Sequence, residues 1–173
     1  MLISQKGRFW KVDNNRFSCS LEALPTIGYQ CIDIVYAGRH LGTRIYTTAS
    51  DQGNMFWGQS NGVTNATSVS DGFSNTNILV SLTDSGAPFD AAISCRSLGD
   101  EWYLPSRDEL QVLYDNRLSI GGFDMGENFP SNTYWTSTET TNKRTHRLRF
   151  SDGCLNCTSH NKSEFLSFRC IRK

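Results

Sequence analysis

The stretch WYLPSRDELQVLYDN at residues 102–116 constrains the fold most, because it joins a strand-like entry to a marked helix start. Ser106 and Glu109 have the spacing of a capping box, in which the Ser106 hydroxyl accepts the Glu109 amide while the Glu109 carboxylate accepts the Ser106 amide. After this cap, apolar residues recur at helical spacing: Leu110, Leu113, Tyr114 and Leu118. The stretch therefore predicts a strand that leads into a helix with one buried stripe.

Composition limits the classes of function. The chain has 173 residues, enough for one domain with a proper core. Its 17 basic and 17 acidic residues cancel, so no overall charge attracts it to nucleic acid or to an anionic membrane. No apolar run approaches the ~18 residues of a membrane span, and the N-terminus lacks a signal-peptide pattern. We expect no nucleic-acid partner, no membrane insertion, and an extracellular or cell-surface location with the targeting signal outside this sequence.

Further elements are indicated by local signals. Residues 31–37 and 43–49 are rich in strand formers and flank a Gly-containing turn, which predicts a hairpin. Asn75 is a candidate N-cap for a short helix over 75–82, and Pro88 suits the first turn of a buried helix over 88–98. Strands are also expected at residues 6–12, 134–138, 145–151 and 165–171.

Two long loops are expected, at residues 51–77 and 121–133. The polar tract at 58–77 has the composition of a linker, but the aromatic residues within and beside it favour an ordered loop. Long ordered loops in a compact domain are usually functional. Both loops are therefore candidate functional segments.

Six cysteines stand at positions 19, 31, 95, 154, 157 and 170. An even set in a domain rich in Gly, Asn and Ser favours disulfides. Zinc binding at Cys154-Leu-Asn-Cys157 and free thiols are the alternatives. A thioredoxin-type redox motif should open a helix, whereas a turn-like Ser-Asp-Gly precedes this one.

Three pairings are predicted from position. In the last strand Leu166, Phe168 and Cys170 point together, so Cys170 faces inward and can meet Cys95 on the buried helix. Proximity in the sequence predicts the other two bonds, which are Cys19–Cys31 and Cys154–Cys157. Three disulfides would place the folded protein outside the reducing cytosol.

Several motifs in a fixed order carry a family resemblance. They are SDQGNMFWG, NGVTNATSVSDGFSNTNILVSL, DAAISCRSLGDEWYLPSRDELQVLY, IGGF, YWTSTE, LRFSDG and the terminal SFRCIRK. In this order they resemble the Lcl C-terminal domain family, the terminal domain of a bacterial collagen-like adhesin. The resemblance covers residues 35–173, whereas residues 1–34 form a lead-in segment without a counterpart that packs on or extends the domain. No collagen-like Gly-x-y repeat is present.

The resemblance implies a C-type-lectin-like, α+β fold, with short helices packed on a mainly antiparallel twisted sheet with long ordered loops. Such domains sit at the tips of adhesins, pili and phage tail fibres. The family is linked with sulfated-polysaccharide binding and trimerisation, so the implied partners are a cell-surface glycan or receptor, a homotrimer, or a larger pilus or fibre protein. Loops and surface charge change the ligand freely on one scaffold, so ligand identity does not follow from the fold.

The candidate ligand-binding residues combine aromatic and basic side chains. They are Phe56, Trp57, Trp135, Lys143, Arg147 and Arg149. The three basic residues share one face of the predicted strand, and arginine binds sulfate, phosphate or carboxylate bidentately. The alternative is a solvated strand face paired with acids such as Glu139 or Glu164.

Metal and catalytic sites find little support. Asp124, Glu127, Asn128 and Asn132 form an oxygen-rich cluster, but their spacing fits no calcium motif, which favours an ordinary polar loop. The three histidines lie far apart, and the nucleophile-elbow, phosphate-loop and zinc-protease motifs are absent. We therefore expect no catalytic residues, no metal and no cofactor.

Two classes of function remain. The first is a non-enzymatic recognition domain at the tip of a bacterial surface adhesin or pilus, which binds an acidic or phosphorylated glycan such as lipopolysaccharide or a sulfated polysaccharide. The second is a structural or trimerising tip module of a pilus or phage tail fibre without its own sugar specificity. An exposed aromatic patch beside the basic strand would favour the first class, and a flat apolar face repeated about a symmetry axis would favour the second.

Overall fold

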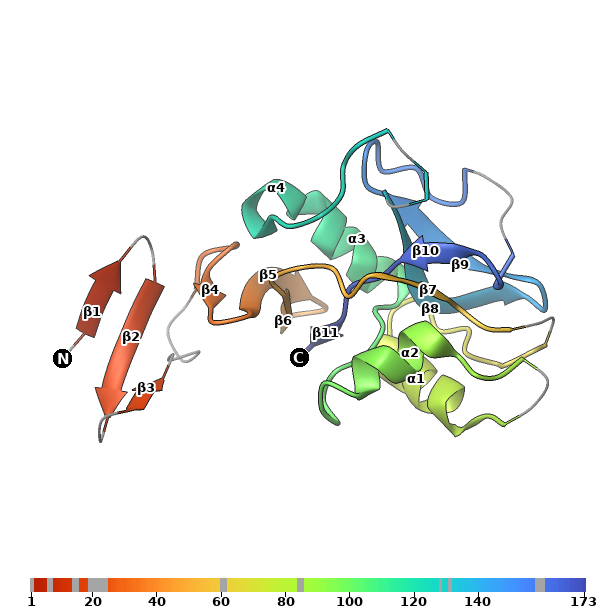
Figure 1. Ribbon diagram of the computed structural model, residues 1–173, viewed down its shortest axis with the longest axis horizontal. Helices are drawn as coiled ribbons and strands as arrows, with labels where there is room; N and C mark the ends of the chain where they lie inside the picture. Colours follow the sequence, from red (N-terminus) through yellow and green to blue (C-terminus); the bar gives the residue numbers. More distant parts are fainter. Residues whose placement is uncertain are drawn as a thin grey trace.

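The computed structural model has an α+β fold, as the sequence led us to expect (Figure 1). It describes residues 2–5, 8–13, 16–18, 25–59, 62–83, 86–127, 129–130, 132–157 and 161–173, with side chains from residue 25 onward. Within these ranges, four short helices accompany two mostly antiparallel four-stranded sheets, and a three-stranded sheet lies near the N-terminus.

The helices are α1 (Gly72–Ser81), α2 (Asp90–Arg96), α3 (Arg107–Asp115) and α4 (Arg117–Ile120). The N-terminal strands are β1 (Leu2–Gln5), β2 (Arg8–Asp13) and β3 (Arg16–Ser18). The remaining strands are β4 (Gln30–Cys31), β5 (Ile34–His40), β6 (Thr43–Thr48), β7 (Asn54–Phe56), β8 (Thr133–Thr141), β9 (Arg144–Arg149), β10 (Phe165–Ser167) and β11 (Ile171–Arg172).

The predicted hairpin is confirmed as strands β5 and β6, which pair antiparallel around a turn at Leu41 and Gly42. They lie in a sheet of order β11-β6-β5-β4. Strand β4 comes from the expected lead-in segment and pairs with β5, with Cys31 opposite Ile34. The strand expected at residues 6–12 corresponds to β2, which pairs with β1 and β3. The division into residues 1–34 and 35–173 stays an expectation.

The second large sheet has the order β7-β10-β8-β9, with β10 parallel to β8 and the other pairs antiparallel. The single strand expected at residues 165–171 is wrong in one respect, because it is split into β10 and β11, which belong to different sheets. At the crossing, the Arg169 guanidinium bonds to Asp51 and Cys170 is disulfide-bonded to α2. These two contacts fix the chain where it passes from one sheet to the other.

The capping box at the start of α3 is confirmed. Ser106 accepts the Glu109 amide, and the buried Glu109 carboxylate accepts the Ser106 amide at 2.9 Å. The same carboxylate accepts the amide of Gly72 at 3.0 Å, so one side chain joins the starts of α1 and α3. The predicted buried stripe is shorter than expected, because α3 ends at Asn116 and a new helix, α4, begins there. Leu118 lies on α4 and is exposed.

The two middle helices differ from prediction at their starts. Helix α1 is capped by Asp71, which accepts the amide of Ser74 at 3.0 Å. Asn75, the predicted cap, is instead buried inside the helix and donates to the carbonyl of Ser68. Helix α2 begins at Asp90, two residues after Pro88, and one side of it faces solvent. The expectation that this helix is buried all round is therefore wrong.

The predicted Cys95–Cys170 disulfide is present and joins α2 to the chain just before β11, with Cα atoms 5.3 Å apart. Both cysteines belong to a core cluster with residues of α1, β8 and β10. Cys154 and Cys157 form a second disulfide, with Cα atoms 5.7 Å apart. Cys19 lies outside the described residues, so its pairing with Cys31 stays a prediction.

Candidate functional site

The aromatic part of the predicted ligand site is corrected by the structure. Trp57 and Trp135 are both 0 % exposed and belong to the core. The Trp57 indole N–H donates to the Thr136 carbonyl at 2.7 Å, and the Trp135 indole N–H donates to the Met55 carbonyl at 2.9 Å. Rings in this position cannot stack on a sugar, so the exposed patch expected of the two tryptophans does not form.

Phe56 is half-buried at the edge strand β7. Its ring packs edge-on against Phe165 of β10, with centroids 5.3 Å apart. Together with Met55 and Ile93 these rings line a shallow hollow of about 340 Å³. Phe56 therefore lies on an apolar surface distinct from the basic strand.

The loop after β7 is ordered because a buried ion pair holds it. The Lys162 ammonium pairs with the Glu139 carboxylate of β8, and it also donates to the carbonyl of Gly62 at 2.6 Å. The carboxylate accepts the amides of Thr64 and Asn65 at 3.0 and 3.2 Å. Glu139 is therefore part of the scaffold and is not the surface partner of the basic strand.

The second long loop is fixed by Arg169. Its guanidinium bonds to the carboxylate of Asp51 at 2.9 Å and donates to the carbonyls of Gly121 and Gly122. Burial raises the pKa of Asp51, although Arg169 and the hydroxyl of Tyr134 act in the opposite direction. This polar group sets where the loop leaves helix α4.

The three predicted basic residues occupy different environments. Lys143 is exposed in the turn between β8 and β9. Arg149 bonds to the neighbouring Asp152, with Nε 2.9 Å from Oδ1. Arg147 is only 3 % exposed, and its guanidinium has no hydrogen-bond or ion-pair partner among the residues that the structure describes. Of the three, Arg147 alone combines a buried charge with an unfilled bonding capacity.

Two surface hollows adjoin at Arg147. The first, of about 180 Å³, is also lined by Glu127, Asn132, Arg149 and Cys154. The second, of about 420 Å³, lies toward the β8–β9 turn. Its lining includes Arg144, a residue that the alternation of the predicted strand did not select. Since both hollows share Arg147, this side chain is the centre of the candidate site.

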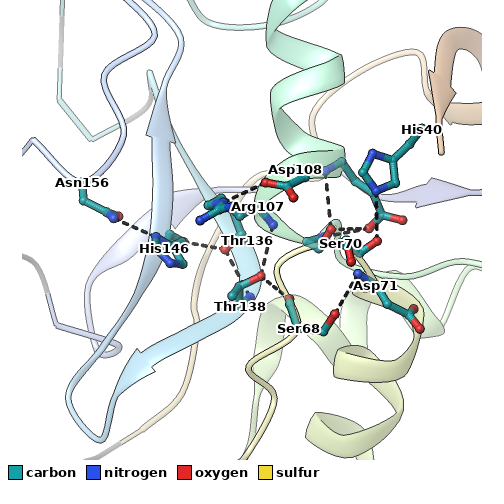
Figure 2. Close-up of polar contacts among 12 residues, drawn as sticks. His40, Ser68, Ser70, Asp71, Arg107, Asp108, Thr136, Thr138, His146 and Asn156 are labelled. Carbon is teal, nitrogen blue, oxygen red and sulfur yellow. Dashed lines mark hydrogen bonds and ion pairs between the residues drawn. The ribbon is translucent and has the colours of Figure 1, made fainter.

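Figure 2 shows the polar contacts of His146, the neighbour of Arg147 on β9. The side-chain amide nitrogen of Asn156 lies 2.7 Å from Nδ1 of His146. The side-chain Oδ1 of Asn156 accepts the backbone amide of Arg147 at 3.1 Å. The backbone N–H of Asn156 donates to the backbone carbonyl of Arg147 at 3.1 Å. The segment after β9 is thereby held along the edge of that strand.

The start of α3 lies beside the same strands in Figure 2. The Arg107 amide donates to the hydroxyl of Thr138 at 3.1 Å, and its guanidinium bonds to Asp108 at 2.8 Å. Burial and then the nearby Arg107 lower the pKa of His146. This cluster is hydrogen-bonded throughout, which is typical of a structural role.

The oxygen-rich loop shows the same internal bonding. Asp124 accepts the amide of Gly126 at 2.8 Å, and Asn132 donates to the carbonyl of Gly126 at 2.7 Å. Asn128 and His160 lie outside the described residues. Within the described ranges, no group of three or more His, Cys, Asp or Glu side chains is placed to hold a metal ion. Over the same ranges, no helix has the length and apolar character needed to span a membrane.

Comparison with known proteins bears on the fold. No family model and no curated protein matches the chain. A solved fimbrial protein from Bacteroides ovatus is similar in structure, with a TM-score of 0.50 and 18 % sequence identity. The match covers 75 % of this chain and 36 % of the fimbrial protein, so the chain spans little more than a third of its length. At this identity the similarity establishes a shared fold.

Proposed function

We propose that this chain is a non-enzymatic recognition module of an extracellular bacterial surface structure, of the pilus or adhesin type, and that it binds an acidic glycan through the surface around Arg147. The shared fold with a fimbrial protein supports the pilus-type setting. The disulfide between Cys95 and Cys170 supports a location outside the reducing cytosol. A C-type-lectin-like arrangement of helices, sheets and loops is part of the proposal.

The observation that carries binding is the state of Arg147. A charged group withdrawn from water is unfavourable unless it is paired and hydrogen-bonded. Arg147 is 3 % exposed and unpaired within the described part of the chain, yet it lines two hollows that open to the surface. An incoming carboxylate, sulfate or phosphate would supply the missing partner in bidentate geometry.

An acidic glycan suits this surface better than a neutral one. The walls carry hydroxyl and amide groups beside the arginines, which can bond to sugar hydroxyls while the guanidinium holds the charge. Lipopolysaccharide, with its phosphate groups, and sulfated polysaccharides both present this chemistry. The two buried tryptophans have no part in the proposal.

Binding of the purified chain to an array of acidic and neutral glycans tests this function. We expect acidic glycans to bind, affinity to fall as salt rises, and Arg147→Gln to weaken binding about 10- to 100-fold, the range for a charged hydrogen bond. Arg39→Gln is the matched control, because Arg39 is exposed on the β5–β6 hairpin and bonds only locally to Gly42. Unchanged binding by folded Arg147→Gln would overturn the proposal, and so would a wild-type chain that binds no acidic glycan.

A structural or trimerising role is the second candidate, and one observation favours it. Phe165 and Ile93 are 52 % and 43 % exposed beside Phe56, which leaves apolar surface at the edge of the sheet. Light scattering of the purified chain tests this role. A trimer that Phe165→Ser dissociates would support it, whereas a monomer at all concentrations would exclude self-assembly.

A further inference from the structure

The larger of the two hollows at Arg147 is built from groups that bind anions. It lies where β8 and β9 approach their connecting turn, and its lining includes Thr140, Thr141, Thr145, Arg144, Arg147 and Asn156. No acidic side chain is among its described lining residues. Its volume of about 420 Å³ falls within the range of small-ligand sites.

The hydrogen-bond pattern leaves donors available in this hollow. The Thr141 hydroxyl oxygen accepts the backbone amides of Lys143 and Arg144 at 3.2 and 3.1 Å. With its oxygen used as acceptor, its own O–H remains able to donate. Arg147 adds an unpaired guanidinium, as judged over the described residues. Available donors without matching acceptors are the complement of an oxyanion.

Electrostatics point the same way. Burial and then the nearby Arg144 lower the pKa of Arg147, while the charge of Glu164 opposes them. Two guanidinium groups therefore lie close enough to repel each other. A bound anion between them would replace that repulsion with two attractive contacts, which outweigh the repulsion from the more distant Glu164 carboxylate, a residue outside the lining of the hollow.

The smaller hollow is less suitable. Glu127 lines it, and a carboxylate would repel an anionic ligand. Its second arginine, Arg149, is already bonded to Asp152 at 2.9 Å. The two hollows that share Arg147 therefore differ in the charge that surrounds it.

We propose that Arg144 and Arg147 together form the seat for one oxyanion carried by a sugar, in the hollow at the β8–β9 turn, with Thr141 as a further donor. This inference rests on the proposed function and specifies its ligand-binding site. Neighbouring sugar hydroxyls bond to the threonine side of the hollow. The seat takes a carboxylate, a sulfate or a phosphate, because all three present oxygen acceptors to guanidinium and hydroxyl donors.

Calorimetry on the whole chain with three probes tests the seat: tetragalacturonate for carboxylate, a heparin tetrasaccharide for sulfate together with carboxylate, and mannose 6-phosphate for phosphate. Arg144→Gln should weaken the best-bound probe about 10- to 100-fold. Thr141→Val keeps the shape but removes the whole hydroxyl, both the O–H donor and the acceptor of the Lys143 and Arg144 amides, and it should weaken binding about 2- to 10-fold. Arg144→Gln should fold normally because Arg144 is exposed. Since Thr141→Val takes an acceptor from two turn amides, its circular dichroism spectrum must match that of the wild-type chain before its affinity is compared.

Two control variants separate a specific seat from general charge attraction. Lys143 is exposed next to Arg144 but does not line the hollow, so Lys143→Gln should change affinity less than about twofold. Glu127→Gln should likewise have little effect, because Glu127 lines the other hollow. Equal losses in Lys143→Gln and Arg144→Gln would overturn the seat, since only the net charge would then matter.

The outcomes also separate this inference from the proposed function. If Arg147→Gln weakens binding while Arg144→Gln does not, and Glu127→Gln strengthens it, the ligand occupies the smaller hollow and the seat is wrong although recognition stands. If the wild-type chain binds none of the acidic probes, both proposals fail. If Arg144→Gln weakens the binding of one probe more than the binding of the other two, this result supports the seat and identifies which oxyanion it holds.

Discussion

Lys162 and Glu139 form an ion pair in which only 2 % and 3 % of the two side chains are exposed. Glu139 lies on β8, whereas Lys162 precedes β10. The Lys162 ammonium also lies 4.8 Å from the centroid of the buried Trp57 ring, close enough for a cation–π contact. This pair therefore links the middle of a sheet to the loop that carries Trp57.

Removing one charge of this pair should destabilise the fold strongly. Glu139→Gln leaves the Lys162 ammonium buried without its counter-charge and weakens the contacts to the loop amides. We expect the free energy of unfolding to fall by about 3–5 kcal/mol. Urea denaturation followed by circular dichroism measures the change, and a loss below about 1 kcal/mol would contradict a structural role for the pair.

The double variant Glu139→Gln with Lys162→Met is the control. Replacing both charges removes the uncompensated ammonium, so part of the lost stability should return. Arg149→Gln tests the contrast with a surface pair, since Arg149 and Asp152 are largely solvated. That substitution should leave the free energy of unfolding almost unchanged.

The two disulfides should differ in their effect on stability because they close loops of different length. Cys95 and Cys170 are separated by 75 positions and Cys154 and Cys157 by three. Loop-closure entropy predicts about 4–5 kcal/mol for the first and about 2 kcal/mol for the second. Paired substitutions to alanine, compared by urea denaturation, measure both. A larger loss for Cys154→Ala with Cys157→Ala would contradict this ordering.

The features predicted correctly from the sequence depend on local signals. The capping box needs only Ser106 and Glu109 three residues apart, so the start of α3 was found. The start of α1 was missed because Asp71 and Asn75 are both good N-caps. Tertiary packing decides between them: Gly72, next to Asp71, donates its amide to the buried Glu109 carboxylate. The sequence pattern of a single helix does not contain a contact that this helix makes with another helix, so the pattern could not choose between the two caps.

The candidate site was predicted only in part, for two physical reasons. Aromatic residues beside a polar loop can face either way, and the indole contacts of Trp57 with Thr136 place that ring in the core. Arg144 was missed because strict alternation puts it opposite Arg147. A register shift between Glu139 and Thr141 of β8, opposite Arg144, breaks that alternation near the turn.

His146 should make stability dependent on pH. Its pKa lies below the ordinary value of 6.5, because burial and Arg107 disfavour the charged form more than Asn156 and Asp108 favour it. The unfolded chain then binds the proton more readily than the folded one. The stability that the neutral imidazole gives the folded state is therefore fully present above about pH 6.5, and it is lost as the pH falls through the folded pKa. We expect the free energy of unfolding to decrease from about pH 7 to about pH 5.

His146→Gln isolates this contribution. Glutamine does not titrate, so the difference in stability between the variant and the wild-type chain should narrow as the pH falls over that window. Urea denaturation at a series of pH values measures it. A difference that is constant with pH would show that His146 has the same pKa in both states.

Gly72 is a position where an added methyl group should be poorly tolerated. A Cβ there would meet the Ser106 amide nitrogen, and it would lie 2.6 Å from Glu109 Oε2 and 2.7 Å from the Leu104 carbonyl oxygen. Two of these neighbours are backbone atoms that cannot move aside without shifting the start of α3. We expect Gly72→Ala to lower the free energy of unfolding by about 1–3 kcal/mol through overpacking and loss of the shared Glu109 contacts.

Gly126→Ala is the matched control for this substitution. A Cβ at Gly126 would meet only the Asp124 Oδ1 atom, at 3.1 Å, and this side chain, which accepts the Gly126 amide, would need to shift by only a few tenths of an ångström. Thermal unfolding of the two variants should therefore show a clear decrease in Tm for Gly72→Ala and little change for Gly126→Ala. Equal Tm values would mean that the contact between the starts of α1 and α3 is looser than the Glu109 hydrogen bonds indicate.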